Sequence, residues 1–199
     1  MKTLRNAGVA MFAGTALTLI TTIYFIASFL SNYELTDLMS KEKILRMLTE
    51  IYPLPLYLLH SALSIVIVIF SYAGFIYLGK KFKQKQLLIS AWVILLATIT
   101  SALVLGGIAY QVVYLSSQNR ALLLYQTLTT TLFLVVSVVS YILLGLALEK
   151  LKDVELSKIT GRLYVISGAT LIIMIGNLLL LLTQIFAGLM FLKASKKFE

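Results

Sequence analysis

The stretch RLYVISGATLIIMIGNLLLLLTQIFAGLMFL, residues 162–192, decides how this chain would cross a membrane. It contains no Asp, Glu or Lys. As one helix it would be about 45 Å long, which exceeds a hydrocarbon core of about 30 Å. As two helices it would give about 22 Å each, which is short of a full crossing. The choice between one helix and a hairpin therefore sets the number of spans and the side of the membrane on which the C-terminus lies.

The composition of the whole chain predicts an integral membrane protein. Of its 199 residues, 60% are hydrophobic and only 13% are charged, whereas soluble domains usually carry about a quarter charged residues. We therefore expect an all-α, polytopic transmembrane helix bundle. The chain has no cysteine, which excludes disulfides, iron–sulfur clusters and thiolate metal sites within it.

The apolar runs predict a single integral membrane domain over residues 1–199. We expect four full spans followed by a short terminal hairpin, or five spans if the last block is one long helix. The predicted spans cover residues 8–30, 56–78, 87–115, 121–148 and 162–192.

The polar segment 31–52 predicts an amphipathic helix on the outer side. It opens with Ser31 and Glu34 at the spacing of a capping box, and apolar residues then recur at roughly helical intervals between charged ones. Such a helix can lie at the membrane interface, or it can be a solvated loop helix packed on its own protein.

The distribution of Lys and Arg favours the terminal hairpin. With a hairpin, 13 of the 17 basic residues lie on one side and 4 on the other; with a single terminal span the division is 10 to 7. Basic residues concentrate on the cytoplasmic side of membrane proteins. We therefore expect a multi-pass protein of the cell membrane with both termini in the cytoplasm.

An internal repeat also favours the hairpin. Three segments begin alike, from residues 5, 86 and 160, and three end alike, at 72–78, 144–148 and 186–192. This pattern predicts three helical hairpins that each leave and return to the same face. In the third hairpin, Gly176 is expected to end one helix and Asn177 to cap the next.

The connector and the start of the last block resemble a known family. The sequence here is similar to the C-terminal half of a family of small archaeal multi-pass membrane proteins of unknown function. The similar run extends from Leu148-Glu149-Lys150-Leu151 to Gly161-Arg162-Leu163-Tyr164 and is followed by Gly168-Ala169. The resemblance is best over residues 120–192. It implies a membrane bundle, but it transfers no functional residues because the family has no established activity.

Few polar residues lie inside the predicted spans, and none of them is ionisable at depth. This argues against a proton-coupled transporter or a charged ion filter. Asn177 and Gln184 are seven residues apart and would share one face of a continuous helix. Together with Gly176 they are candidates for a polar cavity, or they form hydrogen bonds between helices worth about 0.6 kcal/mol each.

The single histidine and the aromatic residues are interpreted as interfacial. His60 near the outer start of the second span is expected to be a structural residue, or a ligand shared with a partner. Tyrosines near both ends of the spans are typical of an aromatic belt; those assigned to the inner side include Tyr141 and Tyr164.

The sequence contains no pattern for catalysis, for a cofactor or for a metal. The leading hypothesis is a non-enzymatic structural or accessory bundle. The alternative is a small channel or carrier for a neutral or lipid-like solute, and a lipid-modifying membrane enzyme ranks third. The expected partners are the lipid bilayer, anionic lipids at the basic cytoplasmic face, and other membrane proteins or further copies of the chain. Nucleic acid is not expected, because the positive-inside rule accounts for the net charge of +9.

Overall fold

Helices form nearly all of the chain that the structure describes. The computed structural model describes residues 1–33, 43, 47, 49–51, 53–111, 120–173 and 175–198, with only the backbone of 105, 109 and 120–123. Within these residues there is no strand, and the fold is an all-α helical bundle. Its elements are α1 (Lys2–Asn32), α3 (Leu54–Lys81), α4 (Lys85–Ala109), α5 (Arg120–Glu149), α6 (Ser157–Thr170), the 3-10 helix η3 (Leu171–Ile173) and α7 (Ile175–Lys197).

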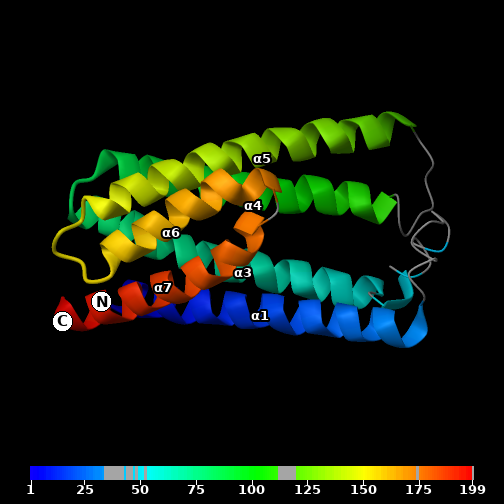
Figure 1. Ribbon diagram of the computed structural model, residues 1–199, viewed down its shortest axis with the longest axis horizontal. Coiled ribbons are helices and arrows are strands. Elements are labelled where there is room, and N and C mark those ends of the chain that lie inside the picture. The colour runs from blue at the N-terminus through cyan, green and yellow to red at the C-terminus, as the bar shows by residue number, and fades with distance from the viewer. Residues whose placement is uncertain are drawn as a thin grey trace.

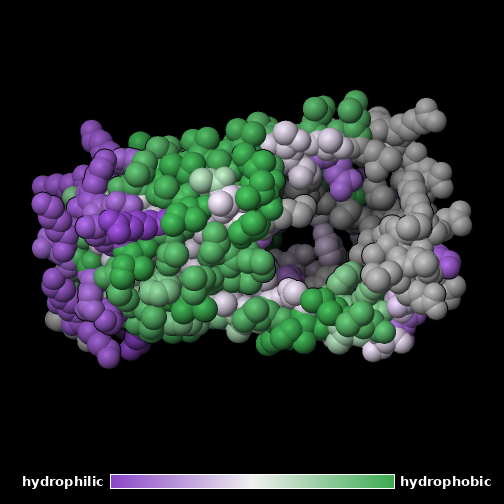
Figure 2. All heavy atoms as spheres, viewed as in Figure 1, coloured by the Kyte–Doolittle hydropathy of each residue, from purple (hydrophilic) through white to green (hydrophobic). Residues whose placement is uncertain are grey.

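Five of the described helices are long and apolar enough to cross a membrane, namely α1, α3, α4, α5 and α7. Their side chains make the flank of the bundle apolar, while hydrophilic residues gather at one end (Figure 2). The predicted amphipathic helix over 31–52 lies largely outside the described residues. Within that segment, Met47 and Ile51 are buried, and the Tyr33 hydroxyl donates a hydrogen bond to Glu50.

The last apolar block is a hairpin, and the alternative of one long helix is wrong. α6 runs into the bundle, the chain turns through η3, and α7 returns beside α6 (Figure 1). The Ser167 and Thr183 hydroxyls, one on each arm, are 3.0 Å apart. The arms are unequal: α6 has 14 residues and α7 has 23.

The position of the turn differs from the predicted one. The α6 helix gives way to η3 at Leu171–Ile173, and α7 already includes Ile175 and Gly176, so Asn177 is not its cap. Gly176 instead lies in the first turn of α7 against the end of α6. A Cβ at Gly176 would lie 2.4 Å from the Ser167 carbonyl oxygen and the Leu171 nitrogen. Gly176 therefore permits the close return of the chain and does not end a helix.

Both termini lie at the same end of the bundle, called here the basic end (Figure 1). The turn between α3 and α4 and the loop between α5 and α6 lie there too. Lys193 pairs with Glu155, and the Lys197 ammonium donates a hydrogen bond to the Asp153 carbonyl at 2.7 Å. These contacts hold the C-terminal turn of α7 against the α5–α6 loop.

The helices form a ring in which each packs against its neighbours in the chain. α1 contacts α3, and the contacts continue in order through α4, α5, α6 and α7, which packs against α1 and closes the ring. The ring consists of three hairpins, α1/α3, α4/α5 and α6/α7, whose outer connections fall partly outside the described residues. This arrangement agrees with the three-hairpin prediction made from the internal repeat.

Glycines allow close contact where one hairpin meets the next. A Cβ on Gly145 of α5 would lie 2.4 Å from the Gly161 carbonyl oxygen of α6. A Cβ on Gly8 of α1 would lie 3.0 Å from the Gly188 carbonyl oxygen of α7. All four glycines belong to the segments that repeat in the sequence. The repeat therefore marks the seams between hairpins.

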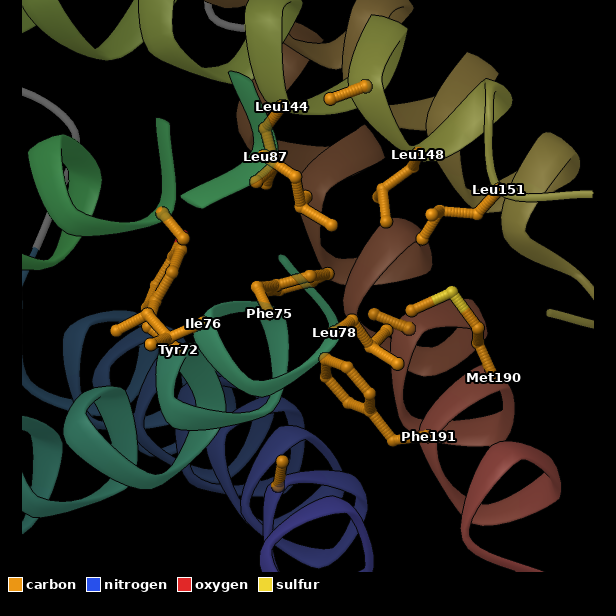
Figure 3. Packing of buried hydrophobic residues seen from close by; sticks show 14 of the residues in the cluster. Tyr72, Phe75, Ile76, Leu78, Leu87, Leu144, Leu148, Leu151, Met190 and Phe191 are labelled. Atoms are coloured by element: carbon orange, nitrogen blue, oxygen red, sulfur yellow. The ribbon is translucent and has the colours of Figure 1, made fainter. Parts of the chain in front are cut away.

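The half of the ring nearer the basic end is filled by a hydrophobic core (Figure 3). Phe75 of α3 is fully buried at its centre, with its ring centroid 4.7 Å from that of Phe191 and 5.7 Å from that of Tyr164. Leu144 and Leu148 of α5 and Met190 of α7 surround it. This packing closes the basic end of the ring.

Candidate functional site

A polar cavity lies inside the ring, beyond the hydrophobic core. It has a volume of about 120 Å³, and α1, α3, α5, α6 and α7 all contribute to its wall. Its apolar lining includes Met11, Ile67 and Leu180. Its polar lining residues are Thr18, Ser64, Ser71, Tyr72, Tyr141, Tyr164 and Gln184.

The cavity sits deep within the apolar part of the bundle. Ser71 is ten residues before the last residue of α3, Lys81, and Ser64 is seventeen residues before it. At 1.5 Å per residue these positions are roughly 15 Å and 26 Å from the basic end. In a hydrocarbon layer of about 30 Å, such a site would lie near mid-depth.

Three tyrosines from three helices form the wall on the side of the core. The rings of Tyr141 and Tyr164 are stacked, with centroids 5.8 Å apart and an interplanar angle of 11°. The hydroxyls of Tyr72 and Tyr141 are 3.4 Å apart. Tyr164 is only 1% exposed. The prediction that Tyr141 and Tyr164 belong to a membrane-interface belt is therefore wrong, because both pack inside the bundle.

Gln184 places an amide in the opposite part of the wall. The Thr15 hydroxyl of α1 lies 3.2 Å from Gln184 Oε1 and 3.0 Å from the Met11 carbonyl oxygen. The hydroxyl has a single proton, so it can donate to only one of these two oxygens, while the Gln184 amide can both donate and accept. The cavity thus presents an amide group beside several hydroxyls.

The lining residues carry no formal charge. Hydroxyl and amide groups both donate and accept hydrogen bonds, so the wall can bind an uncharged polar group. A charged ligand would lose its hydration without gaining a counter-charge, which is costly at this depth. Among the described residues, no group of three His, Cys, Asp or Glu side chains could hold a metal ion.

The residues proposed for a polar cavity lie in different places. Gln184 lines the cavity. Gly176 is buried in the turn of the α6/α7 hairpin, and Asn177 is exposed at the start of α7; neither is part of the cavity wall. His60 is half-buried on α3 and also lies outside this wall.

Sequence reasoning missed the tyrosines and the serines of α3. Ser64 and Ser71 are seven residues apart, so the spacing of small polar residues was a usable signal that both face the same side of a helix. The tyrosines gave a misleading signal, because Tyr164 lies two residues from Arg162 and so looks interfacial. Only the tertiary arrangement shows that they meet.

Comparisons of the chain with protein-family models, with curated proteins and with solved structures found no match. The resemblance to the archaeal family therefore stays a prediction. Fold and site together define an all-α bundle with helices long and apolar enough to cross a membrane, and with a neutral polar cavity among them.

Proposed function

We propose that the protein is a non-enzymatic carrier or narrow channel for a small neutral solute, with the cavity between α1, α3, α5, α6 and α7 as its binding site. The observation that supports this proposal is the lining itself: six hydroxyls and an amide line one uncharged space, together with apolar side chains, within an apolar bundle. A helix bundle that served only as a scaffold would not need to gather polar side chains around a space at this depth.

The size of the cavity restricts the solute. A volume of 120 Å³ corresponds to about four water molecules at about 30 Å³ each. Small uncharged molecules with several hydrogen-bonding groups, such as urea or glycerol, are of this order. Apolar lining from Met11 and Leu180 would tolerate short carbon chains on such a molecule.

The described residues limit access to the cavity from the basic end. Toward the basic end, the packed core around Phe75 and Phe191 closes the way. Toward the opposite end, Thr21 and Ser28 continue the polar face of α1 beyond Thr18, and Ser28 and Asn32 line a second pocket of about 570 Å³.

The basic end is proposed to face the cytoplasm. Thirteen of the 17 Lys and Arg residues belong to segments at this end, in line with the positive-inside rule. Anionic lipids are proposed to gather there, since each basic residue near such a surface is worth about 1 kcal/mol. The role of an accessory subunit with membrane-protein partners, or of a homo-oligomer, stays a prediction.

Solute flux across liposomes tests the proposal. Protein reconstituted in phosphatidylcholine vesicles should raise the rates of urea and glycerol entry, measured by stopped-flow light scattering, above those of protein-free vesicles. Replacing Thr18 by Val removes one hydroxyl from the cavity. We expect a two- to tenfold change in flux, because one hydrogen bond is worth about 0.5–1.5 kcal/mol.

Thr170→Val is the matched control. Thr18 and Thr170 both donate to the carbonyl four residues before them, at 3.0 Å to Gly14 and 2.7 Å to Ile166, but only Thr18 lines the cavity. Flux should be unchanged in Thr170→Val. Equal flux in vesicles with and without protein, or equal effects of the two substitutions, would reject the proposed function.

A further inference from the structure

We infer that Thr15 of α1 is a positioning residue of the cavity: its hydroxyl holds the Gln184 side chain of α7 in the wall, where the amide binds the solute. The inference rests on the proposed function, since it assigns the residue that prepares the same cavity for its solute. Thr15 itself is not part of the cavity wall, so its effect on a solute passes through Gln184.

The Thr15 side chain is enclosed in the seam between α1 and α7. It is only 5% exposed, and the two helices lie side by side (Figure 1). In the same seam, a Cβ on Gly8 would lie 3.0 Å from the Gly188 carbonyl oxygen. This close approach of the two backbones lets a side chain as short as threonine reach the neighbouring helix.

The amide end of Gln184 stands at the cavity. Gly14, the residue before Thr15, lines the cavity together with Gln184. A Cβ on Gly14 would lie 4.0 Å from Gln184 Oε1. The group that Thr15 contacts is therefore also the group that a solute in the cavity would meet.

Thr15 does not need Gln184 to satisfy its own hydrogen bonding. Its Oγ1 is 3.0 Å from the Met11 carbonyl oxygen one turn earlier, the same bond that Thr21 makes to Leu17 at 2.8 Å. The contact with Gln184 Oε1 at 3.2 Å comes in addition and links two helices. A hydroxyl both donates and accepts. Thr15 can therefore donate to the amide oxygen, or donate to Met11 and accept from the amide nitrogen.

Holding the glutamine in place changes what it costs to bind a solute. A glutamine side chain has several rotatable bonds, and fixing them when a solute binds costs conformational entropy. Thr15 restrains the side chain before the solute arrives, and such preorganisation strengthens binding. We therefore expect Thr15 to set the affinity for the solute, with little effect on the maximal flux.

Urea flux into liposomes, measured over a range of urea concentrations, tests this role. Thr15→Val keeps the shape of the side chain and removes the hydroxyl. The urea concentration at half-maximal flux should rise about two- to tenfold, as expected for one lost hydrogen bond, while the maximal flux stays near that of the wild type. Thr15→Ser keeps the hydroxyl and should restore the wild-type concentration.

Gln184→Met supplies the background that isolates the positioning role. It removes the amide and keeps an unbranched side chain. If Thr15 acts through Gln184, adding Thr15→Val to this variant should cause no further change, so the two effects are not additive. A hydroxyl that only stabilised the packing of helices would have the same effect in both backgrounds.

Thr183→Val is the matched control. Thr183 is the neighbour of Gln184 in α7 and is fully buried. Its hydroxyl likewise contacts a carbonyl of its own helix, that of Leu179 at 2.8 Å, and a side chain of another helix, that of Ser167 at 3.0 Å. It is not part of the cavity wall. Thr15→Val and Thr183→Val should lower the SDS concentration at half-unfolding alike, but only Thr15→Val should weaken the affinity for urea.

The outcomes separate this inference from the proposed function. Suppose that the wild-type protein shows saturable, Thr18-dependent urea flux. Equal effects of Thr15→Val in both backgrounds, or an equal loss of affinity in Thr183→Val, then overturns the role of Thr15 and leaves the proposed function standing. Equal urea entry into vesicles with and without the wild-type protein rejects the proposed function, and the role of Thr15 falls with it.

Discussion

Lys83 holds the turn between α3 and α4 in a backbone conformation that usually belongs to glycine. Its φ is 53°. The Gln84 N–H donates to the Gly79 carbonyl at 2.9 Å, and the Lys83 N–H donates to the Lys80 carbonyl at 3.2 Å. These two bonds form a Schellman motif, in which the residue at the position of Lys83 takes the left-handed conformation. A side chain in this conformation costs about 1–2 kcal/mol.

Replacing Lys83 by Gly should therefore stabilise the protein by about 1 kcal/mol. The measurement is unfolding of the detergent-solubilised protein by heat or SDS, followed by circular dichroism. Lys80→Gly removes the same side chain from the last turn of α3 and should destabilise by about 1 kcal/mol, because glycine is a poor helix former. Equal effects of the two substitutions would contradict the assigned turn.

Single residues also show where sequence reasoning fails. Gln184 is a candidate for a polar cavity or for a hydrogen bond between helices, and in the structure it lines the cavity and lies 3.2 Å from the Thr15 hydroxyl of another helix. Tyr164 was assigned to the interface because it lies near Arg162, yet it is 1% exposed. A neighbour in sequence predicts depth in the membrane, but it does not predict whether a side chain faces lipid or the inside of the ring.

At the scale of helices, the seam between α5 and α6 is the closest contact between hairpins. The Gly145 and Gly161 positions face each other, and a Cβ on either would lie within 2.5 Å of the other's carbonyl oxygen. Two backbones at this separation cannot accept even one methyl group without moving. The small residues that favour helix association in membranes act in the same way.

Gly145→Ala should destabilise the protein by about 1–3 kcal/mol, as expected for overpacking. Gly107→Ala on α4 provides the matched control, because a Cβ there meets nothing within 4 Å. Alanine is the better helix former by about 1 kcal/mol, so this second variant should be neutral or more stable. The SDS concentration at half-unfolding compares the two, and a Gly145→Ala protein as stable as Gly107→Ala would refute the assigned seam.

The helices themselves were predictable from the apolar runs, but the turn of the third hairpin was not. Gly176 and Asn177 carry the usual signals for the end and the start of helices. The chain instead turns through η3 before them. Gly176 serves packing, since a Cβ there would lie 2.4 Å from the Ser167 carbonyl oxygen of α6. A packing role for glycine has no local signature in the sequence.

At the scale of the whole molecule, the ring places both termini at one end. The chain contains no cysteine, so single cysteines can report on sidedness with an impermeant maleimide. The test uses four exposed residues, each replaced singly by cysteine. Three lie at the basic end, namely Lys2, Lys152 and Lys196, and Asn32 lies at the far end of α1. In right-side-out vesicles only Asn32→Cys should react, given a cytoplasmic basic end.

Labelling of Lys196→Cys together with Asn32→Cys, while Lys2→Cys stays protected, would contradict the returning hairpin. Ser195 is a poor choice for this experiment, because its side chain is only 3% exposed. Permeabilised vesicles supply the positive control, since all four variants should then react.

The order of helices around the ring could be anticipated only in part. Three hairpins follow from the repeat and from the count of basic residues on each side. Their closure into a ring does not, because helices that are apolar on every side lack the polar face that would show which side turns inward. The cavity depends on that closure, so its tyrosine lining was beyond the reach of the sequence pattern, although the spacing of Ser64 and Ser71 indicates that both face one side of α3.

The contact between α1 and α7 has a consequence for biogenesis. Gly8 and Gly188 meet in the finished protein but lie 180 residues apart in the chain. At a synthesis rate of about 5–20 residues per second, roughly 10–40 s separate their emergence from the ribosome. During this interval the face of α1 that later packs against α7 has no protein contact. Lipid or an insertion chaperone must cover that face until α7 is inserted and displaces it.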